Sequence, residues 1–439
     1  MNTETTHSAA IAAGAATATA RAATEAIEVA GAGPRAAPAA ATQPPAITQS
    51  TGPRPPAARI RAALTDRLAA HARQLPGGPC GDISSPQVLA DRPDGTVVRL
   101  GSTVCKAHAA DADQAELTIR LAIAAHPNLD TILLAPLATA SSRRRTPPGA
   151  RRPRSGPEVT SPPAGGPGSA SPPAARPGGF AADPSLAPAL LAPVHGGRLA
   201  SLWPYGAPIA PDDREAVPWE ALGGLLARLH QVPVGELPGP VPPMRGPAKV
   251  ARALERLHAA PSTVAASPAA RAVHAAARLL PDWARGAAPA PRADQLCHGD
   301  LHLGQLVSLC TSSDSASAAS ADARWLLIDV DDLGLGDPAW DLARPAAWFA
   351  TGLLDAAEWT RLLTAYRAAG GPAAGVAGDP WPHLDIPARA LTVQSAALGL
   401  LKAVAAVREL DEAEEAMVAA CARMAGLPTA AGMGRPASA

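Results

Sequence analysis

The chain has 439 residues, enough for two ordinary domains or for one large two-lobed domain. Its 49 prolines and 38 glycines, with 3% aromatic and 17% charged residues, indicate a folded core diluted by segments without apolar patterning. The formal net charge is zero and the basic residues do not gather on one element, which excludes a general electrostatic case for nucleic acid or an anionic membrane as a partner.

The cysteines and the apolar runs indicate a reducing compartment and no membrane span. Five scattered cysteines without a C-x-x-C pair favour reduced thiols over disulfides or zinc ligands. The first residues lack a basic stretch followed by an apolar core, and no apolar run reaches the length of a transmembrane helix. We therefore expect a soluble cytoplasmic protein; the sequence does not set its oligomeric state.

The first half of the chain predicts strands with few helices. Residues 1–55 are rich in Ala, Thr and Pro and are expected to be disordered. The elements expected next, in chain order, are a helix over 57–75, strands within 85–101 around an Asp94–Gly95 turn, a strand within 102–109, a helix over 111–127 capped by Asp111, a strand over 131–138, a disordered insertion over 140–188, and strands within 189–206 around a Gly196–Gly197 turn.

The second half predicts helices around one short hairpin. Helical spacing occurs over 218–232, 248–260, 267–284, 338–350, 355–369, 387–409 and 411–425. Between these lie "LCHGDLHLGQLV" (296–307), a Ser/Ala-rich insertion over 311–323 and an apolar strand over 324–330. Three tryptophans of the later helices, Trp340, Trp348 and Trp359, are predicted to lie in the core.

Strands before helices, rather than regular alternation, predict an α+β fold with two lobes. The expected lobes are residues 56–206, which contain the insertion, and the helical residues 207–427. A disordered tail is expected over 428–439.

Acidic residues gather in three places in the helix-rich half. Asp300 lies in "HGDLHLGQ", Asp329 follows the apolar strand, and Asp337 and Asp341 lie in "GDPAWD". A strand that ends in Asp delivers its carboxylate rigidly to an edge where a cleft can form. Carboxylates without cysteine suit Mg²⁺ better than Zn²⁺. Phosphoryl transfer needs such a cation, a carboxylate for the attacking hydroxyl and a positive side chain on the phosphates.

The candidate for that positive side chain is Lys106. The chain uses only three lysines, Lys106, Lys249 and Lys402, among 38 basic residues. Lys106 lies in the middle of a predicted strand, and Glu116, ten residues later on a predicted helix, could pair with it. Taken alone, an edge-strand lysine that points to water would be the better interpretation.

The order of these features resembles the aminoglycoside phosphotransferase family, relatives of the protein kinases. His298-Gly299-Asp300 with Gln305 resembles the family's H-G-D-x-x-x-x-N loop, and "IDVDDLGLGDPAWDLA" (328–343) resembles its I-D-x-[DE]-x-x-x-x-G-D-P-x-x-D-L-A segment. The loop "HGDLHLGQ" also occurs in the maltokinase-like branch. The resemblance covers roughly residues 60–425 apart from the two insertions, and it implies a protein-kinase-like fold with a small strand-rich lobe and a helix-rich lobe.

The resemblance also implies a small-molecule kinase that uses Mg²⁺ and ATP or GTP to phosphorylate a hydroxyl of an aminoglycoside, sugar or related metabolite. The implied roles are Asp300 as catalytic base, Gln305 and Asp329 as magnesium ligands, Lys106 on the nucleotide phosphates, Glu116 as its orienting partner, Trp203 and Tyr205 in the hinge "LWPYG" (202–206) whose backbone meets the adenine, and His298, Asp337 and Asp341 as supports of the loop.

The chain departs from the family pattern in two ways. Gln305 replaces the usual Asn and adds a methylene, so the second metal site is expected to shift. No G-x-G-x-x-G loop is present, because "DGTVVRLG" reads only as a turn.

The sequence leaves three alternatives to a small-molecule kinase open. A kinase-like fold could serve for binding alone. A metallophosphoesterase is suggested by the D-x-H of Asp300–His302, although its second motif has one residue too many and no G-N-H-[DE] follows. A zinc site at His298 and His302 lacks a later His or Cys pair at the usual spacing.

Overall fold

The computed structural model describes residues 56–72, 85–92, 94–138, 190–209, 217–309 and 324–427. The three segments expected to be disordered, 1–55, 140–188 and 428–439, lie outside these residues, and so does the Ser/Ala-rich insertion 311–323.

The N-terminal lobe is an antiparallel five-stranded sheet. Its strands are β1 (Gln87–Asp91), β2 (Thr96–Leu100), β3 (Thr103–Ala107), β4 (Ala192–Pro193) and β5 (Leu199–Pro204), in the order β1-β2-β3-β5-β4. Backbone hydrogen bonds between Arg92 and Gly95 close the turn between β1 and β2, and Gly196 and Gly197, both at positive φ, lie between β4 and β5. Both turns predicted from Gly-containing pairs are therefore confirmed.

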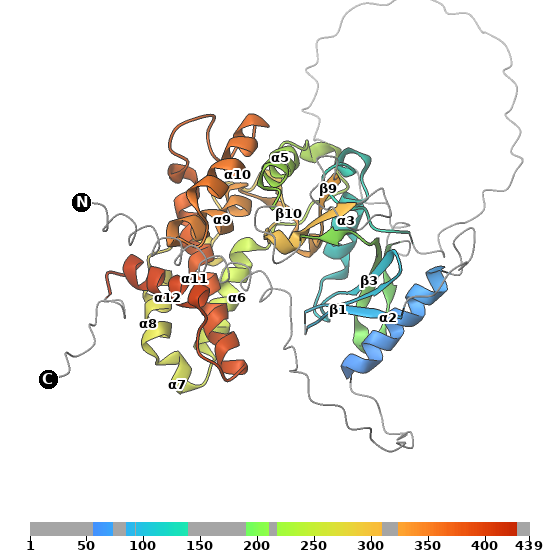
Figure 1. Cartoon of the computed structure of the whole chain (residues 1–439), viewed down its shortest axis with the longest axis horizontal. Helices are drawn as coiled ribbons and strands as arrows, with labels where there is room; N and C mark the ends of the chain where they lie inside the picture. The colour runs from blue at the N-terminus through green and yellow to red at the C-terminus, as the bar shows by residue number, and fades with distance from the viewer. Residues whose placement is uncertain are drawn as a thin grey trace, which may run out of the picture.

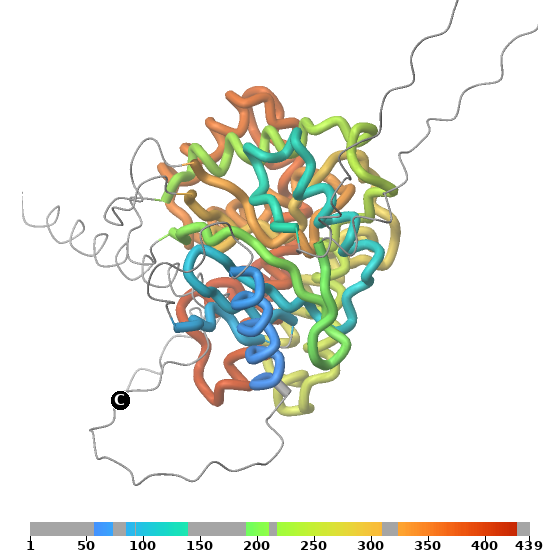
Figure 2. Tube along the Cα trace, turned by 90° about the vertical axis from the view of Figure 1, so that its right-hand side faces the viewer, coloured from blue at the N-terminus to red at the C-terminus, as the bar shows by residue number. Residues whose placement is uncertain are grey.

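Helix α2 (Pro56–Ala72) covers one face of this sheet (Figure 2). Its buried Ile60, Leu64 and Leu68 recur every four residues and so form one stripe along the helix. The stripe packs on a separate small core of sheet residues, Val98, Cys105, Ala107, Ala200 and Leu202. Helix α3 (Gln114–Ala124) follows β3, and its N-cap is Asp113 rather than the predicted Asp111. The side chain of Asp113 accepts from the backbone of Ala115 and Glu116, which fixes the start of the helix at that point.

The C-terminal lobe is helical around two short antiparallel sheets, β7 with β10 and β6-β8-β9 (Figure 1). Its helices are α5 (Trp219–His230), α6 (Gly246–His258), α7 (Ser262–Ala265), α8 (Pro268–Arg278), α9 (Ala339–Thr351), α10 (Ala356–Ala368), α11 (Trp381–Ala405) and α12 (Glu412–Met424). Its strands are β6 (Ala207–Pro208), β7 (Gln295–Cys297), β8 (Leu306–Leu309), β9 (Arg324–Leu327) and β10 (Gly334–Gly336). The three predicted tryptophans are buried.

These elements confirm the expected α+β, two-lobed, kinase-like organisation. The largest differences from the predicted boundaries are six residues long: α11 begins at Trp381 rather than at 387, and the helix expected over 267–284 ends at Arg278. A separate 3-10 turn, Asp282–Arg285, follows that end. Within the described ranges, no helix combines the length and the apolarity needed to cross a bilayer.

Two segments connect the lobes. After β5 the chain runs through Tyr205 to β6, which pairs with β8 of the helical lobe. The segment 131–138, predicted as a strand, makes only isolated bridges: Leu133 with Leu327 of β9, and Leu137 with Leu202 of β5. Its two bridges reach different lobes. The segment therefore links β9 to the N-terminal sheet and does not form a strand within a single sheet.

Helices α5 and α10 approach closely at Gly223. A Cβ atom at this position would lie 2.5 Å from the carbonyl oxygen of Leu362 and 2.9 Å from the amide nitrogen of Tyr366. A Cβ at the adjacent Gly224 would meet only the flexible end of Arg228, at 3.3 Å.

This pair of glycines gives a matched test of the packing. Gly223→Ala should lower the free energy of unfolding by about 1–3 kcal/mol, because the backbones of α5 and α10 must move apart. Gly224→Ala should leave the stability unchanged or raise it by up to about 1 kcal/mol, because Ala favours a helix interior. Urea unfolding of both variants checks the difference; equal stabilities would contradict the close approach.

Candidate active site

The loop 298–302 follows β7 and is held from behind by Asp341 of α9. The Asp341 carboxylate is fully buried and accepts from the backbone nitrogens of His298 at 2.6 Å and Gly299 at 2.9 Å. It also accepts from Nε2 of His230 at 3.0 Å, while the Tyr366 hydroxyl donates to Nδ1 of the same ring. Burial disfavours the charged carboxylate, but these donors outweigh it and lower the Asp341 pKa. Asp341 therefore fixes the loop backbone, as predicted for a supporting residue.

His298 and Gly299 connect the same loop to the segment that carries Asp329. His298 is buried and donates from Nε2 to the carbonyl oxygen of Ile328 at 2.8 Å. Gly299 has φ +82°, and a Cβ there would lie 2.3 Å from the carbonyl oxygen of Asp332. Only glycine permits this backbone conformation and this contact together. The two acidic segments therefore have a fixed spacing.

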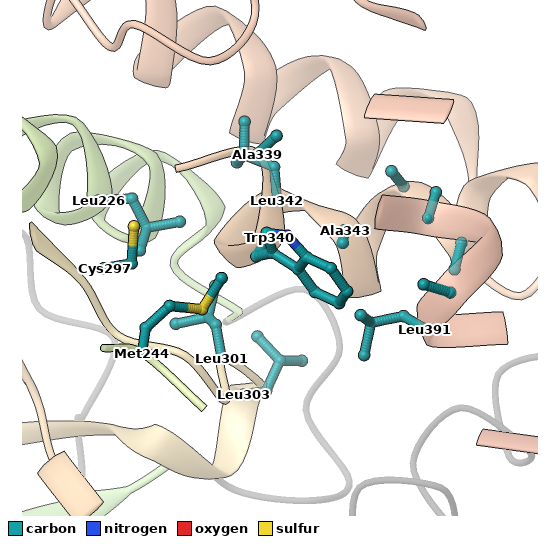
Figure 3. Packing of buried hydrophobic residues seen from close by; sticks show 14 of the residues in the cluster. Leu226, Met244, Cys297, Leu301, Leu303, Ala339, Trp340, Leu342, Ala343 and Leu391 are labelled. Atoms are coloured by element: carbon teal, nitrogen blue, oxygen red, sulfur yellow. The ribbon is translucent and has the colours of Figure 1, made fainter. Parts of the chain in front are cut away.

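Apolar side chains anchor the loop from the other side. Leu301 and Leu303 point into a buried cluster with Met244, Trp340 and Leu391 (Figure 3). Polar and apolar residues thus alternate through the loop. Leu301 and Leu303 anchor its backbone in the core, and Asp300, His302 and Gln305 are the polar side chains that remain available for the site.

Lys106 of β3 forms an ion pair with the acidic segment of the other lobe. Its Nζ lies 2.5 Å from Asp329 Oδ1 and 3.0 Å from Asp331 Oδ2. Burial disfavours the ammonium, but the two carboxylates outweigh it and raise the Lys106 pKa. Lys106 is thus a partly buried cation, 14% exposed at its side chain, that faces the acidic site, and the interpretation as a lysine that points to water is wrong.

A hydrogen-bonded chain behind Lys106 contains residues that the sequence did not single out. Nδ1 of the buried His108 donates to Asp331 at 3.0 Å, and its Nε2 accepts from the Ser201 hydroxyl at 2.8 Å. Ser201 in turn accepts from the indole nitrogen of Trp203 at 2.8 Å. His108 lies two residues after Lys106, and in an extended chain such residues lie on the same side. This spacing could have placed His108 beside Lys106 from the sequence.

Asp329 and Gln305 offer oxygen donors that fit a magnesium ion. Asp329 has φ +65°, uncommon for a residue with a side chain, and its carboxylate is 38% exposed. Nε2 of Gln305 donates to Asp329 Oδ2 at 3.2 Å, so the amide already faces this carboxylate, and a half-turn of the amide would present its oxygen. A carboxylate and an amide oxygen without a thiolate suit Mg²⁺.

Asp300 is held between two cations that come from different helices. Lys249 of α6 lies 2.5 Å from its Oδ2, and Nη2 of Arg344 of α9 lies 3.0 Å from its Oδ1. Burial disfavours the Asp300 carboxylate, but Lys249 and then Arg344 outweigh it and lower its pKa. Asp300 is therefore ionised. Neither Lys249 nor Arg344 was predicted to lie here.

Glu116 does not contact Lys106, contrary to the expected pairing. Its carboxylate accepts from Nη1 of Arg120, one helical turn later, at 2.8 Å. Arg120 is buried and donates from Nε to the carbonyl oxygen of Leu333 in the helical lobe. Glu116 thus neutralises a buried guanidinium, which is nearer to it than Lys106 is.

The structure gives three further predicted residues the following contacts. Trp203 in β5 is buried and its indole nitrogen donates to the Ser201 hydroxyl; the expected contact of the hinge backbone with an adenine stays a prediction. Tyr205 lies at the crossing between the lobes, with the Arg99 guanidinium 3.3 Å above its ring. Asp337 caps α9 by accepting from the backbone of Ala339 at 3.0 Å, which is a local contact and not a direct support of the loop.

The residues do not build a zinc site at this loop. His298 is bonded to Ile328, and Nδ1 of His302 accepts from the backbone of Gly304 at 3.1 Å. Burial lowers the His302 pKa to about 4, so the ring is neutral. A second trio, His230, Cys297 and Asp341, is close enough to share an ion. Burial raises the Cys297 pKa, so its sulfur stays protonated, and the other two side chains already bond one another.

Comparison with known proteins bears on these residues. The model of the phosphotransferase enzyme family matches residues 168–381, a segment that holds Asp300, Gln305, Asp329 and Asp341 but not Lys106. The expected resemblance to the aminoglycoside phosphotransferase family is thereby confirmed. No curated protein matched the chain.

Solved structures with similar folds have low identities. A choline/ethanolamine kinase family protein from Mesorhizobium loti is 15% identical, with 83% of this chain and 96% of that chain covered and a TM-score of 0.44. A thermostable mutant of the aminoglycoside phosphotransferase APH(4)-Ia is 11% identical, with coverages of 80% and 96% and a TM-score of 0.45. The macrolide 2'-phosphotransferase MphH from Brachybacterium faecium is 17% identical, with coverages of 84% and 99% and a TM-score of 0.37. At these levels the likenesses say nothing about the substrate of this chain.

The anchoring role of Asp341 predicts a large loss of stability on truncation. Asp341→Ala should lower the free energy of unfolding by about 3 kcal/mol, because two loop amides and a buried histidine lose their acceptor. The control Asp337→Ala removes only a helix cap and should cost about 1 kcal/mol. Chemical denaturation of both variants tests this; equal losses would contradict the anchor.

Proposed function

We propose that this protein is a small-molecule O-phosphotransferase that uses ATP or GTP. The observation that carries the proposal is the meeting of Lys106, Asp329 and Asp300 at the junction of the lobes. Lys106 and Asp329 are 223 residues apart in the chain, yet they form one ion pair beside the loop that holds Asp300. Phosphoryl transfer requires a cation that binds the phosphates, a carboxylate that binds the metal ion, and a second carboxylate that accepts a hydrogen bond from the attacking hydroxyl.

In this reaction Asp300 accepts a hydrogen bond from the hydroxyl of the acceptor and turns its oxygen toward the γ-phosphorus. The new bond joins that oxygen to phosphorus, and the bond to the oxygen bridging the β- and γ-phosphates breaks. The electron pair leaves on the nucleoside diphosphate, and the hydroxyl proton passes through Asp300 to solvent. Because the anion of Asp300 is held by two cations, its main contribution is orientation.

Lys106 binds the nucleotide phosphates once they replace its present carboxylate partners. The turn between β1 and β2 lies beside it, since a Cβ at Gly95 would be 4.0 Å from Cε of Lys106. Asp329 and Gln305 would hold Mg²⁺, which when bound neutralises charge on the phosphates. The backbone near Tyr205, where the chain crosses between lobes, is the proposed contact for the base.

The acceptor is proposed to be a hydroxyl of an aminoglycoside, a sugar or a related metabolite. A screen of nucleotide consumption with aminoglycosides, macrolides, sugars and amino alcohols tests the proposal. Turnover that depends on both nucleotide and acceptor is expected. A fold used only for binding would give none, and release of phosphate from esters without nucleotide would indicate a phosphoesterase.

The role of Asp300 predicts a loss of turnover without a loss of nucleotide binding. Asp300→Asn should lower kcat by about 10²–10⁴-fold, because the neutral amide loses the ion pairs with Lys249 and Arg344 that fix its orientation and cannot take up the hydroxyl proton. The Kd for nucleotide, measured by calorimetry, should change less than about threefold. Full turnover of this variant would remove Asp300 from the reaction.

The proposed metal role of Asp329 predicts a loss of nucleotide binding, unlike the substitution of Asp300. Asp329→Asn should weaken Mg²⁺-dependent nucleotide binding by about 10–100-fold, because one of the metal's oxygen donors loses its charge. Titration with nucleotide in the presence of Mg²⁺ or of EDTA gives the metal-dependent part. If the variant and the wild type show the same dependence on Mg²⁺, the proposed metal role of Asp329 is wrong.

A further inference from the structure

Lys249 lies where its helix does not favour a positive charge. It occupies the first turn of α6, where its backbone nitrogen donates to the carbonyl oxygen of Arg245 at 2.9 Å. The N-terminal end of a helix carries partial positive charge, so a cation there is unfavourable unless anions compensate it. The compensating anions are Asp300 and Asp332, which lie in two different loops.

The ammonium of Lys249 bridges these carboxylates in a mostly enclosed position. Nζ is 2.5 Å from Asp300 Oδ2 and 2.9 Å from Asp332 Oδ2. The three side chains are exposed by 24%, 21% and 16% for Lys249, Asp300 and Asp332 respectively. Arg245 also lies near Asp332, with Nε at 3.5 Å from Oδ1, so Asp332 has a second cation while Lys249 is shared.

The choice of lysine at this position is informative. The chain has 38 basic residues and only three of them are lysines. Two of the three, Lys106 and Lys249, lie on the acidic site. A compact ammonium can serve two carboxylates at once, whereas the planar guanidinium of Arg fits one carboxylate with paired hydrogen bonds.

The two cations on Asp300 fix both of its oxygens. Oδ2 contacts Lys249 and Oδ1 contacts Arg344, so rotation of the carboxylate would break both contacts. Each oxygen of a carboxylate can accept a second hydrogen bond, which leaves a lone pair for an acceptor hydroxyl. Arg344 also donates from Nε to the carbonyl oxygen of Leu301 and thus supports the loop backbone, while Lys249 reaches the carboxylates.

We propose that Lys249 is a positioning residue of the phosphotransfer reaction: it holds the Asp300 carboxylate ionised and oriented for the acceptor hydroxyl, and Asp332 fixes Lys249 in place. This inference rests on the proposed function and adds a residue of α6 to it. Through Lys249, the start of α6 becomes part of the alignment of Asp300.

The test compares kcat, KM and pH profiles of Lys249→Met with those of the wild type, using an acceptor found in the screen. We expect kcat to fall about 10–100-fold, as for the loss of orientation, while KM for nucleotide changes less than about twofold. The acid limb of kcat/KM should move to higher pH, because a carboxylate that loses a neighbouring cation has a higher pKa. The other groups that face Asp300, namely Arg344 from α9, His302 of the same loop and the more distant Asp329, are unchanged in this variant.

Two further variants keep the test sharp if Lys249→Met folds poorly. Lys249→Arg keeps the charge and should restore part of kcat and return the acid limb toward the wild-type position. Asp332→Asn should lower kcat in the same direction as Lys249→Met but by less, because Lys249 then keeps only Asp300. The matched control Arg256→Met removes an exposed charge from the same helix and should change none of these quantities.

The outcomes separate the inference from the proposed function. If the wild type turns over and Lys249→Met has wild-type kcat and an unmoved acid limb, the inference fails alone. A fall in kcat with an unmoved acid limb and a lowered melting temperature would indicate only a structural role and would also overturn it. If the wild type shows no turnover with any acceptor of the screen, the proposed function fails and the inference fails with it.

Discussion

The ion pair between Lys106 and the carboxylates of Asp329 and Asp331 is the interaction on which the site depends. Two carboxylates so close together in a partly buried position repel one another, and a nearby cation compensates this repulsion. That cation comes from the other lobe, on strand β3, so the register of the small sheet decides whether the acidic segment is stable. His108, two residues later and directly after the end of β3, binds Asp331 as well and makes the dependence stronger.

The loop that carries Asp300 is held by contacts that have no direct part in chemistry. Asp341 accepts from its backbone, His298 connects it to the segment before Asp329, and the leucines on either side of His302 enter the core. With the loop backbone fixed, only the side chain of Asp300 can still rotate. The ion pairs with Lys249 and Arg344 restrict that rotation as well. The structure thus fixes the orientation of Asp300 by its own contacts, which is the contribution that the proposed phosphoryl transfer requires.

Local sequence patterns predicted many of the helices and turns. They failed for contacts between residues that are distant in the chain or that have more than one available partner. Helical spacing located α2 and α5, and the Gly-containing turns located the hairpins. The pairing of Lys106 with Glu116 was wrong because Arg120, four residues after Glu116 on the same helix, is the nearer cation. The strand expected over 131–138 was wrong because an apolar run does not reveal that its two ends bridge to different lobes.

The sequence by itself determined the candidate residues for the proposed reaction: Asp300 with Gln305 at a fixed spacing, and Asp329 after an apolar strand. These are local relations, since residues five positions apart can be separated by at most about 18 Å whatever the fold. Only the tertiary structure decided which cation each carboxylate meets. Lys106 reaches Asp329 across 223 residues, and Lys249 reaches Asp300 from the start of α6. An ion pair depends on distance in space, and strand register and helix packing set that distance.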